Sequence, residues 1–232
     1  MPERASEFPF VNRLVMDFPF FLKYYVDHCP FTKFGQLEYH LETIQRRREL
    51  GSAKAALKDN AYLKSLYKTI KAWGIGLRGS KLRPFDDFVS ALNTRAMEIS
   101  ELDGLKLGQG GLEEESLVSG IWRLIETTQI VENKAKLVPC SKTLHHILPD
   151  LIVPIDREYT QLFFGWQNPE FQYAQAGCFD KAFRAFVHIS NMVNLGQYVG
   201  TGWNTSLTKV IDNSLVGSIL YLKSKYKADE IS

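Results

Sequence analysis

Apolar residues recur along this chain at spacings of three and four positions, the repeat of an α-helix with one buried face. In residues 31–50, for example, Phe34, Leu37, Leu41 and Ile44 fall on one such face. The pattern predicts helices over residues 12–28, 31–50, 53–73, 84–99, 112–131, 178–194 and 205–224. Because no stretch alternates polar and apolar residues for long enough to form a sheet, we expect an all-α protein.

Prolines and glycines divide this helical pattern. Pro19 lies inside the first predicted helix and indicates a kink or a late start. Gly74, Gly76 and Gly79 form a loop, and residues 104–111 form a linker with four glycines. The loop lacks the spacing of a dinucleotide-binding or phosphate-binding motif, so we interpret its glycines as residues that end a helix.

The composition allows one hydrophobic core, or two small lobes that share one, because 45% of the 232 residues are hydrophobic. We expect one compact helical domain over residues 1–232, in which residues 8–104 and 112–232 could form two lobes with a cleft between them. The chain has no 18-residue apolar run and no signal-like N-terminus, so we expect no membrane association. Its three separated cysteines are typical of reduced thiols, which favours a cytoplasmic protein.

Charge is distributed unevenly along the chain. Residues 33–83 carry twelve lysines and arginines against four acidic residues, a local net charge of +8. Residues 84–132 carry three basic against ten acidic residues, a local net charge of −7. The basic half could follow a phosphate backbone, although by charge alone we favour the simpler interpretation of helices that face water or the acidic segment.

The candidate chemistry lies between two predicted short helices. Ser141 is a suitable N-cap, so Lys142 is expected to open the first helix, and Pro154 interrupts the chain before Asp156 opens the second. At a helix N-terminus an amine is biased toward its neutral, nucleophilic form, which attacks a sugar carbon to form a Schiff base. A neighbouring carboxylate stabilises an oxocarbenium charge, so together the two groups suit cleavage of an N-glycosidic bond in DNA.

This segment resembles the helix-hairpin-helix DNA glycosylase superfamily, whose members are all-α proteins that excise damaged or modified bases. The resemblance covers residues 136–164, with Lys142 at the place of the Schiff-base lysine and Val153-Pro154-Ile155-Asp156 at the place of the segment with the catalytic aspartate. It implies a DNA glycosylase that acts in repair or in defence against modified foreign DNA. The glycines of the family's hairpin are missing here, and the lysine and the aspartate are fourteen positions apart, closer than the family norm.

A glycosylase also needs a pocket for the extruded base and contacts to the DNA backbone. The candidates for the pocket are Trp166, Tyr198, Trp203 and His145. The candidates for backbone contacts are Arg46, Arg47, Arg78, Lys81 and Ser141.

We expect no cofactor and no metal, since His145 and its neighbour His146 lack the spacing of metal ligands on one helix. Lys209 and Asp212 are most simply an ion pair on the last helix. The alternative to an enzyme is a helical DNA- or protein-binding module without catalytic activity.

Overall fold

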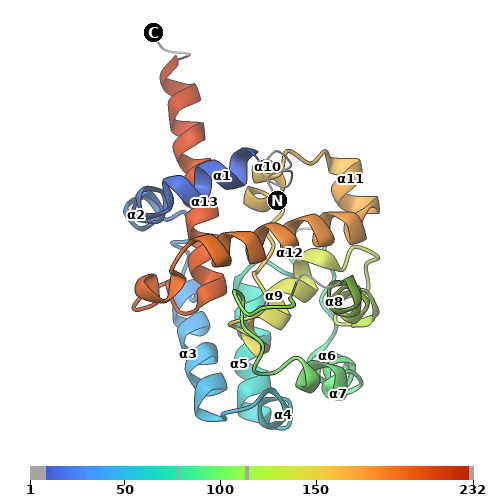
Figure 1. The fold of residues 1–232 in the computed structure, drawn as a ribbon. Helices are drawn as coiled ribbons and strands as arrows, with labels where there is room; N and C mark the ends of the chain where they lie inside the picture. The colour runs from blue at the N-terminus through green and yellow to red at the C-terminus, as the bar shows by residue number, and fades with distance from the viewer. Residues whose placement is uncertain (1–8, 78, 113–114, 230–232) are drawn as a thin grey trace.

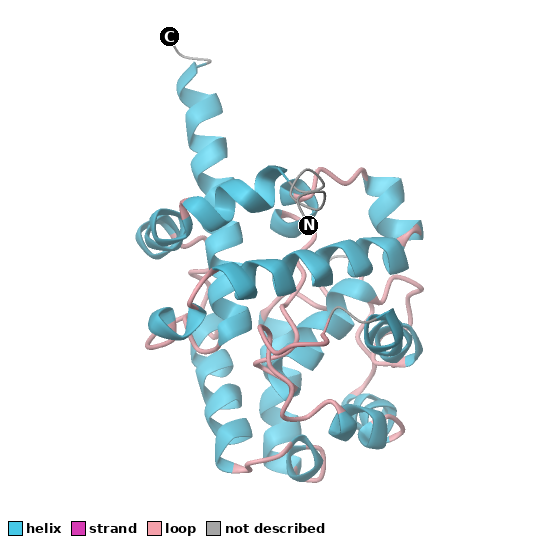
Figure 2. Cartoon of the chain, viewed as in Figure 1, coloured by secondary structure: helices cyan, strands magenta, loops and turns pink. Residues whose placement is uncertain are grey.

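The computed structural model describes residues 9–77, 79–112 and 115–229, and within these ranges the chain is helical with connecting loops (Figures 1 and 2). The helices are α1 Pro9–Met16, α2 Phe18–His28, α3 Gln36–Glu49, α4 Ala53–Ala56, α5 Asn60–Ala72, α6 Phe85–Asn93, α7 Ala96–Glu101, α8 Glu115–Thr127, α9 Leu137–Ile147, α10 Tyr159–Phe163, α11 Asn168–Tyr173, α12 Gln175–Met192 and α13 Leu207–Asp229, with a 3-10 helix at Leu195–Tyr198. In the described residues β pairing is limited to one isolated bridge, Leu82 with Val131. The all-α prediction is confirmed.

Several predicted helices are divided by caps within the periodic stretches. The first predicted helix becomes α1 and α2, with Pro19 in the first turn of α2, where its missing N–H costs nothing. The helix predicted over residues 53–73 becomes α4 and α5, because the Asp59 carboxylate accepts a hydrogen bond from Tyr62 N at 2.6 Å and starts α5 afresh.

The prediction for the start of α9 is wrong. The helix begins at Leu137 rather than after Ser141, so Lys142 lies in its middle and away from the positive end of the helix dipole. Gln175 explains the earlier start, because its Oε1 accepts hydrogen bonds from the backbone N–H groups of residues 136 and 137, both at 2.9 Å. Pro139 is tolerated in the first turn, where a backbone N–H has no partner inside the helix.

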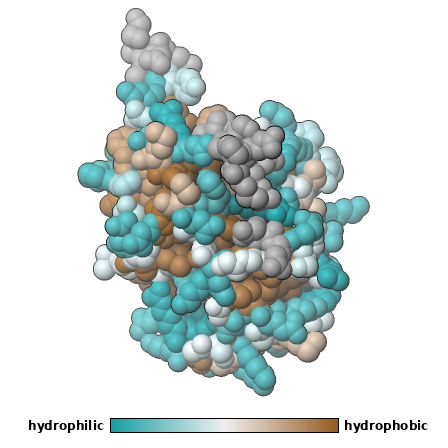
Figure 3. All heavy atoms as spheres, viewed as in Figure 1, coloured by the Kyte–Doolittle hydropathy of each residue, from teal (hydrophilic) through white to brown (hydrophobic). Residues whose placement is uncertain are grey.

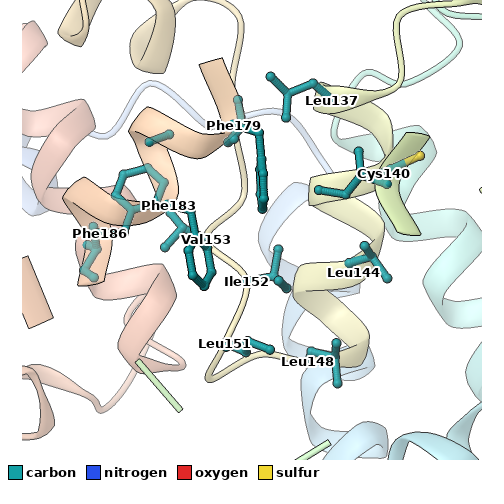
Figure 4. Close-up of a cluster of buried hydrophobic side chains, with 14 of the residues drawn as sticks. Leu137, Cys140, Leu144, Leu148, Leu151, Ile152, Val153, Phe179, Phe183 and Phe186 are labelled. Carbon is teal, nitrogen blue, oxygen red and sulfur yellow. The ribbon is translucent and has the colours of Figure 1, made fainter. Parts of the chain in front are cut away.

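One hydrophobic core extends through the chain, from Val11 to Ile219. Figure 4 shows α9 and α12 on either side of residues 151–153, with Ile152, Val153 and Phe183 among the side chains between them. Since the two predicted lobes share this core, the packing does not separate them. In the view of Figure 3 hydrophilic residues cover much of the surface, with smaller hydrophobic areas between them.

The long helix α13, the last in the chain, packs against α2 near the N-terminus, so segments from the two ends of the sequence lie side by side. Gly217 permits the close crossing, since a Cβ at this position would lie 2.0 Å from the carbonyl oxygen of Phe21. The last turns of α13 extend beyond the body of the protein (Figure 1). Among the described residues, none of the helices combines the length and the apolar character that crossing a bilayer requires.

Candidate functional site

A pocket of about 70 Å³, partly open to solvent, lies where the two halves of the sequence meet. Its lining consists of Phe31, Gln36, Trp73, Lys142, Pro154, Asp156, Trp203, Lys209 and Asp212. The set contains two lysines, two aspartates and three aromatic rings, so charged groups and flat apolar surfaces face the same space.

Lys142 and Asp156 meet in this pocket. Lys142 Nζ lies 2.9 Å from Asp156 Oδ2, and their side chains are 10% and 23% exposed. The second carboxylate oxygen, Oδ1, accepts hydrogen bonds from the backbone N–H groups of Glu158 at 2.7 Å and Tyr159 at 3.3 Å, which caps the turn into α10. The carboxylate is therefore held by the backbone on one side and by the ammonium group on the other.

Ser141 connects the two elements that carry this pair. Its hydroxyl donates to Val138 O and accepts from Ile155 N, both at 3.1 Å, so α9 is tied to the segment that delivers Asp156. Ser141 is fully buried. The sequence suggested Ser141 as a contact to the DNA backbone, but its buried hydroxyl cannot reach one. It instead fixes the relative position of Lys142 and Asp156.

Two opposing effects act on the pKa of Asp156. Burial raises the pKa, but Lys142 and the hydrogen bonds from Glu158 and Tyr159 outweigh burial and leave the pKa below its usual value. Asp156 is thus an anion at neutral pH. Lys142 Nζ also reaches the carbonyl oxygen of Trp73 at 3.5 Å and lies 6.0 Å from the centre of the Trp73 ring.

Lys209 and Asp212 form a second ion pair in the pocket, as the sequence predicted for positions three apart on one helix. Lys209 Nζ lies 2.5 Å from both the Asp212 carboxylate and Asn213 Oδ1. It also lies 5.1 Å from the ring centre of Trp203 and 5.7 Å from that of Trp73. Burial raises the pKa of Asp212 despite the neighbouring ammonium group.

Two indole rings flank the pocket. The ring centres of Trp73 and Trp203 are 6.0 Å apart at an interplanar angle of 49°, and Phe31 packs against Trp203 at 5.8 Å. Trp203 was a predicted pocket residue, and the structure places it in the lining. Trp73, Gln36 and Phe31 were missed.

The other predicted base-pocket residues are not in the pocket lining. Trp166 is buried and stacks on Phe164 at 4.6 Å, and Tyr198 packs against Phe18 at 5.5 Å. His145 is fully buried and lies behind the pocket. Trp166 and Tyr198 fill gaps between helices, as aromatic side chains at apolar positions commonly do.

The predicted backbone-contact residues also divide by environment. Arg47 is buried and bonded to Ile147 O and Asp103, so it holds the interior together and is not a surface contact. Arg46 is partly exposed and pairs with Glu42 at 3.2 Å. Lys81 is exposed and pairs with Glu132 at 2.5 Å. Arg78 lies outside the described residues.

No protein-family model matches the chain, and the comparisons with curated proteins and with solved structures likewise gave no match. The geometry of the pocket is therefore the basis for a functional proposal.

Proposed function

We propose that this protein is a DNA glycosylase, which cleaves the N-glycosidic bond of a damaged or modified base. The observation that carries the proposal is the 2.9 Å contact between Lys142 Nζ and Asp156 Oδ2 in a solvent-accessible pocket flanked by two indoles. An amine, a carboxylate and stacking surfaces are the groups that this reaction needs.

Asp156 stabilises the positive charge that develops on the sugar as the bond to the base breaks. Its lowered pKa keeps the carboxylate ionised at neutral pH, which this role requires. In the covalent route Lys142 first gives up its ammonium proton to water in the partly open pocket, and the leaving base takes up a proton from water as it departs. The nitrogen of Lys142 then forms a bond to the sugar carbon C1′ while the bond from C1′ to the base breaks.

The base itself would enter the pocket beside Trp73 and Trp203 and stack on an exposed indole face. Stacking on aromatic rings tolerates many bases and contributes about 1–3 kcal/mol per base. Gln36 also lines the pocket and offers an amide that can pair with a base edge. The damaged base would thus be held by an indole on one face and by an amide at its edge.

A row of lysines on α5 supports DNA as the substrate. Lys64, Lys68 and Lys71 are exposed and follow one another at helical spacing, so they share one face. In the part of the chain that the structure describes, none of the three forms an ion pair with a carboxylate. Trp73 of the pocket directly follows the last turn of this helix, which ends at Ala72.

The test is incubation of the protein with oligonucleotides that carry a panel of modified bases, in single- and double-stranded form, followed by alkali to cleave abasic sites. Borohydride added during the reaction should trap the protein on DNA, and Lys142→Ala should abolish the trapped adduct. Lys23→Ala, which changes an exposed lysine on α2 that does not line the pocket, is the matched control. Excision that persists without trapping would assign Lys142 to anchoring and leave the chemistry to Asp156.

The competing interpretation is a helical binding module without catalytic activity. In that case no base is lost from any oligonucleotide, and Asp156→Asn binds DNA as well as the wild type or better, because a negative charge has been removed. That pair of results would overturn the proposal.

A further inference from the structure

We propose that His40, His145 and His146 bind a divalent transition-metal ion, with Zn²⁺ as the best fit. His40 comes from α3 and the other two from α9, and all three side chains are fully buried. One ring nitrogen of each lies within 4.8 Å of the corresponding nitrogens of the other two. The three histidines do not line the pocket, but their rings contact the pocket's tryptophans. The ring centres of His146 and Trp73, for example, are 4.7 Å apart.

The Nδ1 atoms of His145 and His146 are held by hydrogen bonds to backbone carbonyl oxygens. His145 Nδ1 donates to Ile152 O at 3.0 Å, and His146 Nδ1 donates to Lys142 O at 2.8 Å. A histidine that ligates a metal typically donates its other N–H to a carbonyl in this way, which sets the tautomer and the ring orientation. Both rings therefore present an unprotonated Nε2 to a ligand.

His145 Nε2 has no hydrogen-bond partner, although it is buried. A buried polar atom without a partner is uncommon in folded proteins and calls for an explanation. Because a ring nitrogen of His145 lies within 4.8 Å of ring nitrogens of His40 and His146, a metal ion shared by the three rings would satisfy this atom.

His40 completes the set by a change of tautomer. Its Nδ1 lies 2.9 Å from His146 Nε2 and, without a metal, donates a hydrogen bond to it. Its Nε2 lies 2.8 Å from Thr205 Oγ1. When the metal binds, the proton of His40 moves from Nδ1 to Nε2 and is donated to Thr205, so the ring stays neutral.

The distances suit a metal with small adjustments. Tetrahedral Zn²⁺ binds imidazole nitrogens at roughly 2.0–2.1 Å, which corresponds to nitrogens about 3.4 Å apart. His40 and His146 are slightly closer than this, so the ion would spread these two rings and draw in the third. Three histidine ligands leave one coordination position open.

The cluster also has the protonation state that ligands need. Burial lowers the pKa of all three histidines, that of His146 to about 4, so the rings are neutral at physiological pH. Lys209, Arg48 and Lys142 are the cations that act on the cluster.

The repulsion from these cations is offset in part. Lys209 pairs with Asp212 and Lys142 pairs with Asp156. Three imidazoles without a carboxylate ligand favour zinc or a similar transition metal over magnesium or calcium.

The test uses the full chain, stripped of metal with a chelator and titrated with Co²⁺, which reports its coordination by visible absorption. We expect one equivalent of Co²⁺, the intense bands of a four-coordinate site, and displacement of cobalt by Zn²⁺. His40→Gln should weaken binding by more than about 100-fold, since even the loss of an outer-sphere partner of a metal ligand costs roughly 10–100-fold. His188→Gln, an exposed histidine on α12, is the matched control and should bind as the wild type does.

A variant that gains an absorption band separates the loss of a metal ligand from a failure to fold. His145→Cys keeps a ligand, and its cobalt complex should add the thiolate-to-metal charge-transfer band, which an unfolded chain with scattered ligands would not give as one tight equivalent. The proposal is overturned if the wild type binds no stoichiometric cobalt, or if His40→Gln and His145→Gln bind as tightly as the wild type. Because no DNA is used, the outcome is independent of glycosylase activity.

Discussion

The two ion pairs of the pocket have the same chemistry but different surroundings. Lys142 and Asp156 come from separate elements and are 10% and 23% exposed. Lys209 and Asp212 lie one turn apart on α13 and are 2% and 9% exposed. One pair is formed by tertiary structure and is partly exposed, whereas the other is local and almost fully buried.

This difference assigns different roles to the two pairs. A buried pair loses hydration that its mutual attraction scarcely repays, and removal of one partner leaves an uncompensated charge inside the protein. A partly exposed pair costs less to separate, so its members remain available to a substrate. We therefore expect Lys142 and Asp156 to control activity, and Lys209 and Asp212 to control stability.

The largest expected effect is on activity. Asp156→Asn should lower the single-turnover excision rate by about 10²–10⁴-fold, the usual contribution of a positioned carboxylate. Asp27→Asn, which alters an exposed aspartate paired with Lys23, should leave the rate unchanged. If Asp156→Asn and Asp27→Asn excise equally fast, the proposed role of Asp156 is wrong.

The next largest effect is on stability, measured as the free energy of unfolding in urea. Lys209→Met should lower it by about 3–5 kcal/mol, because Asp212 is left buried without its partner. Lys142→Met should lower it by only about 1 kcal/mol, since Asp156 keeps its backbone hydrogen bonds and contact with water. Replacing Lys209 by Met and Asp212 by Leu together should recover most of the loss. Equal losses for the two single variants would contradict the comparison.

Acidification should change the contributions of Asp156 and Asp212 to the free energy of unfolding in opposite directions. The pKa of Asp156 is lowered in the folded state, so its contribution to stability is present above pH 3.8 and is lost as the pH falls through the lowered pKa. The pKa of Asp212 is raised, so its contribution is present below pH 3.8 and is lost as the pH rises through the raised pKa.

Urea unfolding of Asp156→Asn and Asp212→Asn across acidic pH measures both contributions. Each unit of pKa difference corresponds to about 1.4 kcal/mol. The stability of the wild type relative to Asp156→Asn should decline on acidification, and that relative to Asp212→Asn should decline as the pH rises. If both stability differences change with pH in the same direction, the environments of the two ion pairs are not distinct.

The smallest effect is expected from Lys68, which forms no ion pair with a carboxylate among the described residues. Lys68→Ala should leave the free energy of unfolding within about 0.5 kcal/mol of the wild type, as exposed charges away from structural features do. It should weaken DNA binding and reduce the slope of log affinity against log salt concentration by about 1, the loss of one phosphate contact. An unchanged slope would remove α5 from the DNA-binding surface, and Lys23→Ala is again the control.

The sequence predicted the helical class because periodic apolar residues dominate it, but local caps and tertiary contacts decided the boundaries. Asp59 starts a new helix within one periodic stretch, as a side-chain cap can. The start of α9 was missed because its cap, Gln175, comes from a helix 38 positions further along the chain. Such a partner has no local signature.

The same distinction applies to the site. Lys142 and Asp156 could be predicted because both lie in one short segment with a recognisable pattern of prolines and caps. Trp73 and His40 could not, since they reach the site only when α3 and α5 pack against α9. A weak signal existed for Trp73, a large aromatic residue between a helix and a glycine loop, but nothing near His40 in the sequence distinguishes it.

The placement of the tryptophans gives this protein an optical reporter of its own. Of its four tryptophans, Trp73 and Trp203 face the pocket, whereas Trp122 and Trp166 pack against phenylalanines elsewhere. A planar guest that binds in the pocket and stacks on these two indoles would quench their fluorescence and leave the other two emitting as before. Replacing Trp122 and Trp166 by Phe would remove the emission of the tryptophans outside the pocket. Occupancy of the pocket could then be followed in real time without a dye.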